Sequence, residues 1–256
     1  MKSVSYIVGI LQKSFFWAWL DVVCQYRRSR IGPFWETINV IVMILGLTLV
    51  SSTVFGGDVY KHLGYIGLGT ITWSAINSLI NEGANTFVRS SALITGTNID
   101  IFVYVGRTVF KVMITFAHHF IIYAIGLILL IVPLGWTSLL AIPGLMLLFA
   151  NGFWVVTLLG FVCARYRDVE LIIRNLLQLA FFFTPVFWNY HDIPPGRHFI
   201  IDYNVAFYFL EIVRSPLLGE IPPLKYYVVA VSVSIVGIAH TVFVVRKMRQ
   251  RLAFFV

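Results

Sequence analysis

The residue types that most often carry out chemistry are sparse in this sequence. His118 and His119 adjoin, so on a helix they point about 100° apart and do not form a joint ligand pair. We expect hydrogen bonds between helices from them instead. Cys24 and Cys163 have no metal-ligand spacing, and no structural disulfide is expected. The sequence predicts no catalytic residue, no metal site and no cofactor in this chain.

Missing motifs exclude further classes of protein. The phosphate-cradling pattern Gly-x-x-x-x-Gly-Lys-Ser/Thr does not occur, so we do not expect this chain to bind ATP itself. Neither the Gly-x-Ser-x-Gly elbow nor His-Glu-x-x-His is present. A membrane-embedded glycosyl- or phosphotransferase would need converging carboxylates, whereas Asp192, Asp202 and Glu211 are spread along the chain. A membrane enzyme is therefore the weakest alternative.

Polar side chains repeat at helical spacing within one apolar block. They are Ser74, Asn77, Ser78, Asn81, Glu82 and Asn85. Residues at this spacing share one face of a helix, and such a face is costly against lipid. Two interpretations remain open, namely hydrogen bonding to other helices and the lining of a watery path. Glu82 is expected to pair with a basic neighbour near the end of the helix.

The elements that carry these residues are long apolar blocks. We place six of them at Phe34–Phe55, Leu63–Phe87, Val112–Val132, Leu139–Cys163, Leu171–Trp188 and Tyr226–Val245. Each is close to the roughly 17–25 residues that a helix needs to cross a bilayer, and the runs are continuous rather than alternating. With 59% hydrophobic residues and a mean hydropathy of +0.87, the sequence predicts an all-α integral membrane protein with six transmembrane helices.

The basic residues are distributed unequally between the two sides of these six spans. Fifteen of the 19 fall on one side: Lys2, Lys13, Arg27, Arg28, Arg30, Arg89, Arg107, Lys111, Arg165, Arg167, Arg174, Arg246, Lys247, Arg249 and Arg251. The other four are Lys61, Arg197, Arg214 and Lys225. Basic residues in short loops mark the cytoplasmic side, which predicts that both termini are cytoplasmic. The net charge of +8 suits anionic membrane lipid rather than nucleic acid.

Two segments outside the six blocks are predicted to lie at the membrane surfaces. Val4–Cys24 is apolar, but as a span it would bury Lys13 and Asp21, so we expect an interfacial helix. Residues 189–224 are expected to form a re-entrant helical hairpin in the outer interface. A single domain over 1–256 thus divides into a cytoplasmic interfacial segment (1–33), spans one to five (34–188), the outer hairpin (189–224), and span six with its tail (225–256).

Four local patterns, taken in their order along the chain, carry a family resemblance. They are the basic run and aromatic segment Tyr26–Trp35, the segment Ala164–Val169, the segment Thr184–Trp188, and Asn204 followed by Glu211–Gly219. Together they resemble the membrane subunit of ABC-2-type polysaccharide exporters, the Wzm-like group that exports O-antigen. The chain departs from that group in Val205, where the group often has proline, and in the absence of proline from Thr95–Asn98.

The resemblance implies a multi-pass permease subunit in the bacterial inner membrane that exports a lipid-linked polysaccharide. Two copies would pair as a homodimer, and two separate ATPase subunits would supply ATP and Mg. The family's main docking helix falls here on Ser90–Phe102, with Ser90, Ser91, Thr95, Asn98, Asp100 and Phe102 as candidate coupling residues. Teichoic acid, capsule or a small hydrophobic compound remain alternative cargoes for such an exporter.

Aromatic and basic side chains supply a candidate path for this cargo. The resemblance implies that the first and fifth spans line it, and the candidates are Phe34, Trp35, Trp73, Phe181, Phe182, Phe183, Phe187 and Trp188. Aromatic belts at the membrane interface use the same residue types. Arg27, Arg28, Arg30 and Arg165 are candidates for a lipid-phosphate entrance, and anchoring to inner-leaflet lipid is the alternative.

Overall fold

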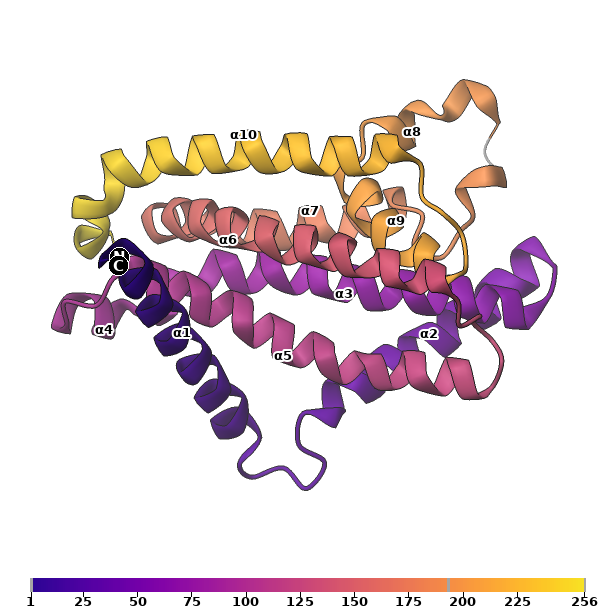
Figure 1. Ribbon diagram of the computed structural model, residues 1–256, viewed down its shortest axis with the longest axis horizontal. Helices are drawn as coiled ribbons and strands as arrows, with labels where there is room; N and C mark the ends of the chain where they lie inside the picture. The colour runs from indigo at the N-terminus through magenta and orange to yellow at the C-terminus, as the bar shows by residue number, and fades with distance from the viewer. Residues whose placement is uncertain (1, 193, 256) are drawn as a thin grey trace.

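The computed structural model describes residues 2–192 and 194–255, and this part of the chain forms helices without strands (Figure 1). The α-helices are α1 (Lys2–Tyr26), α2 (Phe34–Phe55), α3 (Val59–Arg89), α4 (Ser91–Gly96), α5 (Ile101–Ile128), α6 (Ala141–Arg165), α7 (Asp168–Phe183), α8 (Phe199–Asp202), α9 (Val205–Leu217) and α10 (Leu224–Met248). Short 3-10 segments are η1 (Trp136–Leu140), η2 (Tyr190–Asp192), η3 (Pro195–Arg197) and η4 (Arg249–Phe254). The all-α prediction is confirmed.

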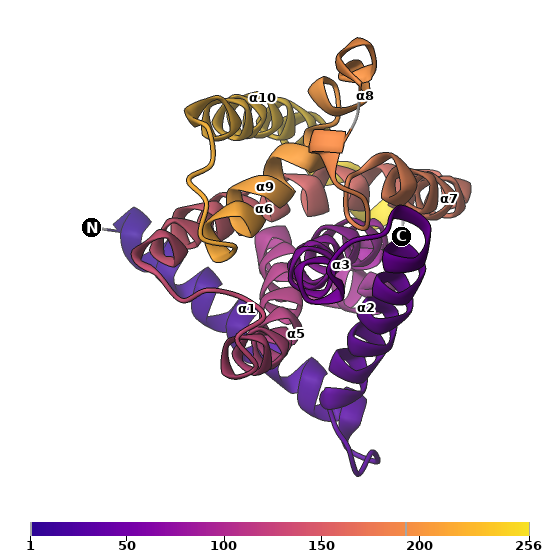
Figure 2. The ribbon, with the colours of Figure 1, turned by 90° about the vertical axis from the view of Figure 1, so that its right-hand side faces the viewer.

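The helices α3, α5, α6 and α10 run along the long axis of the molecule, whereas α1 crosses α5 obliquely (Figure 1). Viewed along that axis, α3 lies in the middle of the bundle, with α2, α5, α6, α7 and α9 around it (Figure 2). Both chain ends and α4 lie at one end of the long axis, and the α2–α3 connection lies at the other (Figure 1).

Small residues bring α3 and α6 close together. A Cβ atom at Gly83 would lie 3.0 Å from the Val156 Cα, and one at Gly160 would lie 2.9 Å from a ring carbon of Phe87. Phe87 and Phe161 also pack edge to face, with 5.1 Å between ring centroids. Close backbone approach at small residues is the usual way that helices associate where water cannot drive their packing. This contact makes α3 and α6 a parallel pair at the centre of the fold.

The predicted count of six spans is not confirmed. Five segments of the described chain are long and apolar enough to cross a membrane: Ser5–Tyr26, Phe34–Val54, Ile101–Ile128, Trp136–Arg165 and Leu224–Phe254. The predicted second span, in α3, and the predicted fifth span, in α7 and the turn after it, are not among these five segments. The N-terminal helix α1 is one of the five. The polar stripe lowers the hydropathy of α3, and α7 has only 16 residues because it ends at Phe183, before Pro185.

The expected outer hairpin is not confirmed either. The segment after α7 forms two 3-10 turns, the four-residue α8 and the 13-residue α9, rather than a pair of antiparallel helices. Every residue of α9 from Phe207 to Leu217 is buried, against α3, α6, α10 and η1. The Asn204 side chain caps α9 by accepting the Phe207 amide at 3.2 Å. This part of the chain is an internal helix of the bundle.

The N-terminal helix is held against α5 by polar contacts. Asp21 accepts two hydrogen bonds from the Arg107 guanidinium, at 2.5 and 2.6 Å, and Arg107 also stacks over the Trp17 ring. The Ser14 hydroxyl lies against α5 at Gly106, where any larger residue would clash with it. Phe15, Phe16 and Trp19 are exposed on α1. The exposed aromatics fit a helix at a lipid surface, and the interfacial position of α1 stays a prediction.

Candidate functional site

A buried polar network closes the C-terminal end of α7. Arg214 on α9 donates to the Pro185 carbonyl oxygen at 2.6 Å and to the Tyr65 hydroxyl of α3 at 2.7 Å, and it stacks 3.7 Å from the Tyr65 ring centroid. Its charge is balanced by Glu211, which also accepts from Ser215. The carbonyl of Pro185 would otherwise be an unpaired acceptor, because the proline interrupts the helix. The network therefore stabilises the break after α7.

Asn204 ties the same break from the other side. Its side-chain amide donates to the Phe183 carbonyl at 3.2 Å and to the Thr184 hydroxyl at 2.9 Å. Gly69 on α3 leaves room for the turn, since a Cβ there would lie 2.8 Å from the Val186 carbonyl oxygen. Burial, with the Glu211 carboxylate nearby, raises the pKa of the neighbouring Tyr190 phenol. The third and fourth sequence patterns thus meet in one structure, although nothing in the sequence indicated Tyr65 or Gly69.

Arg214 and its ion-pair partner are both buried. The Arg214 side chain is 0% exposed and that of Glu211 is 2% exposed. Arg214 therefore adds no free charge to the surface at its end of the molecule. A buried ion pair of this kind is tolerated because each partner keeps further hydrogen bonds, and it contributes a unique geometry rather than surface charge.

The candidate path residues divide into a buried group and an exposed group. Trp73 and Phe181 are buried and pack together with 5.8 Å between ring centroids, and Phe187 stacks on Phe181 at 5.6 Å. We call Trp73, Phe181 and Phe187 the aromatic cluster. It lies between α3 and the end of α7, next to the polar network.

The remaining candidates are accessible. Phe34, Trp35, Phe182 and Phe183 are exposed, and Trp188 is partly buried, with its indole donating to the Phe182 carbonyl at 3.1 Å. Phe34 and Trp35 belong to the first turn of α2, whereas Phe182 and Phe183 end α7. Within one copy, the structure does not bring all eight aromatics to a common surface.

The four candidate phosphate-binding arginines are likewise not one group. Arg27, Arg28 and Arg30 are exposed in the connection between α1 and α2, and Arg27 and Arg28 border a shallow surface hollow. Arg165 ends α6, where its guanidinium lies over the rings of Tyr166 and Phe255 at 5.1 and 5.6 Å. Among the described residues, no contact joins Arg165 to the other three.

The candidate coupling residues lie at the end of the molecule that carries both chain ends. Ser90 stands between α3 and α4, at the C-cap position of the first and the N-cap position of the second, and α4 holds Ser91 and Thr95. Asn98, Asp100 and Phe102 follow in the short connection to α5 and in its first turn. Thr95, Asn98 and Phe102 are exposed, so this segment presents side chains outward.

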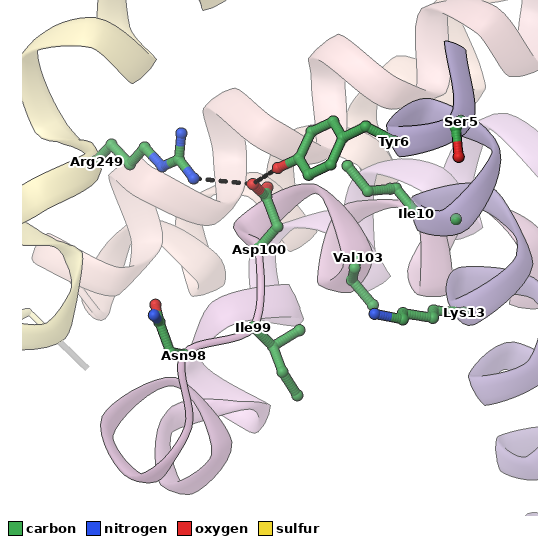
Figure 3. Close-up of a pocket in the computed structure, with 10 residues that line it drawn as sticks. Ser5, Tyr6, Ile10, Lys13, Asn98, Ile99, Asp100, Val103 and Arg249 are labelled. Carbon is green, nitrogen blue, oxygen red and sulfur yellow. Dashed lines mark hydrogen bonds and ion pairs between the residues drawn. The ribbon is translucent and has the colours of Figure 1, made fainter. Parts of the chain in front are cut away.

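Asp100 joins three segments that are distant in sequence (Figure 3). One carboxylate oxygen caps α5 by accepting the Phe102 amide at 3.0 Å. The other accepts the Tyr6 hydroxyl of α1 and the Arg249 guanidinium of the C-terminal tail, the latter at 2.8 Å. These groups border a hollow of about 540 Å³ that also includes Lys13 and Asn98. These contacts could not be predicted from the sequence, because Tyr6 and Arg249 belong to no motif.

Part of the polar stripe on α3 behaves as the first interpretation expected. Ser74 bonds to the buried His119 on α5 at 3.2 Å, which confirms a hydrogen bond between helices for this histidine. Glu82 accepts from Lys111 on α5 at 3.2 Å and from Arg89 at 2.9 Å, so its expected basic partners are present. Residues Asn77, Ser78, Asn81 and Asn85 make no such contact with a neighbouring helix in the described chain.

Comparison with known families identifies this architecture. The family model described as ABC-2 type transporter matches residues 15–218, which is most of the chain. The protein belongs to the ABC-2 type transporter family. It is a multi-pass membrane protein and a transport subunit, and ATP hydrolysis takes place in a separate nucleotide-binding partner. No curated protein matches the sequence significantly.

Proposed function

We propose that this protein is the permease subunit of an ATP-driven exporter that moves a lipid-linked polysaccharide, O-antigen-like, across the bacterial inner membrane. The observation that carries the proposal is the set of aromatic side chains that the chain leaves uncovered on α2 and α7. Trp35 is 52% exposed and Phe182 is 59% exposed, and Phe34 and Phe183 lie beside them in sequence. The resemblance described above assigns the path to these same two spans.

Aromatic faces suit a sliding sugar chain. A flat ring offers apolar contact to the C–H faces of many sugars without hydrogen-bonding to one pattern of hydroxyls. Many weak, equivalent contacts let a polymer advance by one unit at little cost. An aromatic belt at the membrane surface would also leave such rings exposed, so the test must measure export rather than exposure.

A second copy completes the path in this proposal. The exposed faces of α2 and α7 carry further apolar residues, including Leu45 and Leu49 on α2 and Leu176 and Leu179 on α7. A homodimer would bring two copies of these faces together around a central passage. Arg27, Arg28, Arg30 and Arg165 would then lie at its cytoplasmic entrance, where guanidinium groups bind the oxygens of a lipid pyrophosphate.

Six crossings fit the contacts of Asp100 better than five. Asp100 contacts both Tyr6 and Arg249, so all three residues lie on the same side of the membrane. The chain must therefore cross the membrane an even number of times between Tyr6 and Asp100, and again between Asp100 and Arg249. Three long helices precede Asp100, and two of them must cross. The helix α3 runs along the long axis and α1 lies obliquely (Figure 1), so we take α2 and α3 as the first set of crossing helices. The second set is α5, α6, α7 and α10. This assignment leaves α1 at the interface and both termini on the same side, which the distribution of basic residues indicates is the cytoplasmic side.

The ATPase partners bind at that cytoplasmic end in this proposal. Residues Ser90–Phe102 provide the main contact, and the beginning of α1 lies beside it through the Tyr6–Asp100 bond. ATP and Mg would be held by the partner subunits, with none bound by this chain.

The alternatives differ in cargo or in class. An ABC-2 exporter of teichoic acid, capsule or a small hydrophobic compound would share the fold. A membrane enzyme fits less well, because Glu211 is buried in an ion pair and Asp202 pairs with Lys225 at 3.2 Å. Neither carboxylate is left for acid–base catalysis.

Reconstitution separates these cargoes. The protein and its ATPase partner would be placed in lipid vesicles and supplied with a lipid-linked glycan, with the same carrier lipid lacking sugar, or with a small hydrophobic compound. We expect transport and added ATP hydrolysis with the lipid-linked glycan alone. Equal stimulation by the sugar-free carrier, or stimulation by the small compound only, would overturn the polysaccharide assignment.

A further inference from the structure

One row of side chains on α3 changes from aromatic to polar along its length. Trp73, Asn77, Asn81 and Asn85 are spaced by four residues, so they follow one another on the same side of the helix. The three asparagines span about 12 Å, from the middle of α3 toward the end that leads into the coupling segment. We call Asn77, Asn81 and Asn85 the asparagine row.

The asparagine row bonds only to its own helix. The Asn81 amide donates to the Asn77 carbonyl at 3.1 Å and to its side-chain oxygen, and the Asn85 amide donates to the Asn81 carbonyl at 3.2 Å. All three side chains are partly exposed. Their remaining amide atoms are absent from the buried groups that lack a partner, so these atoms reach the surface of the single chain.

Contact between such a row of amide side chains and lipid hydrocarbon is unfavourable. An amide without a hydrogen-bond partner is strongly unfavourable in hydrocarbon, where nothing replaces the hydrogen bonds it makes in water. Polar residues within a span therefore face water, a polar ligand or another helix. The neighbouring stripe positions, Ser74 and Glu82, already bond to α5, whereas the asparagine row has no partner helix.

The helix α7 also exposes polar side chains close to the level of this row. The Trp73–Phe181 contact aligns α3 with α7, which runs in the opposite direction because it follows α6 through a tight turn. One turn back from that contact, Asn77 on α3 is level with Gln178 on α7. Gln178 and Asn175 are exposed, and neither makes a hydrogen bond in the described structure. Glu82 pairs with both Lys111 and Arg89, so no free negative charge stands beside the row.

We propose that the asparagine row lines the cytoplasmic half of the translocation path and binds the hydroxyl groups of the passing sugar chain. The aromatic cluster of Trp73, Phe181 and Phe187 closes the outer end of that half. Neutral amides both donate to and accept from hydroxyls, and each hydrogen bond replaces one to water and is weak in net terms, so a polymer is not trapped. The inference rests on the proposed function for its ligand, but not for the access of water.

Cysteine accessibility tests the proposal in the complete transporter. Cys24→Ser and Cys163→Ala remove the native thiols, and Asn77→Cys, Asn81→Cys or Asn85→Cys then adds one. A small charged thiol reagent, applied from the cytoplasmic side, is expected to label all three positions. Val236→Cys, on the exposed side of α10, is the control and is expected to react at least about tenfold more slowly, since a charged reagent enters hydrocarbon only at a high cost.

The lipid-linked glycan should then slow labelling of the asparagine row. If a small hydrophobic compound slowed labelling and the glycan did not, the asparagine row would still line the path. The polysaccharide assignment would then be overturned. Labelling no faster than at Val236→Cys would overturn the proposal. So would efficient oxidative crosslinking of Asn81→Cys between two copies, which would mean that a second copy covers the row.

Hydrogen bonding is tested by substitution at the same place. Asn81→Ser keeps a hydroxyl and should export at a rate close to that of the unchanged protein. Asn81→Leu removes all polar atoms at similar size and should lose most of its export per inserted molecule. Equal export by the two variants would contradict a role for the amide in binding hydroxyls.

Discussion

At the scale of single residues, two kinds of aromatic side chain share the same stretch of sequence. Phe181 is 9% exposed and belongs to the aromatic cluster, whereas Phe182 is 59% exposed. The sequence grouped them as one set of path residues. Their separation depends on which side of α7 meets α3, and a helix with apolar residues on several sides does not reveal that orientation.

Truncating exposed aromatics should reduce export rather than folding. We expect Trp35→Ala and Phe182→Ala to slow export per inserted molecule, because contact surface for the polymer is lost. Trp136→Ala is the matched control, since Trp136 is 67% exposed in η1 and should act as an interface anchor. The measurement is export normalised to membrane abundance. If Trp136→Ala were as damaging as Phe182→Ala, the exposed rings would be anchors and not path residues.

The buried partner in this pair should respond in the opposite way. Phe181→Ala removes a packed ring from the aromatic cluster and is expected to lower the free energy of unfolding by about 3–5 kcal/mol. Folded yield after detergent extraction and heating reports this loss. A variant with normal yield would place Phe181 outside the packed core.

Arg214 is the residue on which the buried polar network at the end of α7 depends most. Arg214→Met would leave Glu211 buried without its counter-charge, which typically costs about 3–5 kcal/mol of stability. Lys225→Met is the control, because its ion pair with Asp202 is exposed and should contribute less than about 1 kcal/mol. Thermal unfolding in detergent, followed by tryptophan fluorescence, compares them. Similar melting temperatures for the two variants would rule out the stabilising role of the network.

At the scale of elements, the sequence predicted helices best where they are apolar throughout. The first predicted span matches α2 at both ends, and the sixth lies inside α10. The helix α3 exceeds its predicted span at both ends, because polar residues lower its local hydropathy, from which the ends of the span were predicted. The outer segment was predicted least well, because α9 is buried by helices from distant parts of the sequence and its local pattern resembles an interfacial helix.

The Asp100 junction is expected to hold α1 and the C-terminal tail in place. Asp100→Asn keeps a capping side chain for α5 but loses the charge-assisted bond to Arg249. We therefore expect faster hydrogen exchange in η4 and in the first turns of α1, with the start of α5 unchanged. Asp58→Asn is the control, since Asp58 caps α3 through the Tyr60 amide and makes no ion pair. Exchange in η4 that is insensitive to Asp100→Asn would refute the junction.

At the scale of the whole molecule, the positions of the chain ends decide how the sequence crosses the membrane. Charge asymmetry predicted cytoplasmic termini, and the Asp100 contacts supply an independent reason for an even number of crossings. Hydropathy favours α1 as a span and disfavours α3 and α7. The two arguments disagree about which helices cross, so they predict different accessible surfaces.

Labelling of single introduced cysteines distinguishes these topologies. With α1 at the interface, Ser5→Cys and Arg249→Cys should both react only from the cytoplasmic side, and Lys61→Cys, in the first turn of α3, only from the outside. If α1, α2 and α3 all crossed the membrane, Ser5 and Asp100 would lie on opposite sides. The hydrogen bond from Tyr6, the residue after Ser5, to Asp100 excludes that arrangement. If α3 did not cross, the same parity would return Lys61 to the cytoplasmic side. Labelling of Lys61→Cys from inside would therefore exclude the six-span arrangement, whereas labelling from outside, with Ser5→Cys labelled from inside, would exclude the arrangement in which α1 replaces α3.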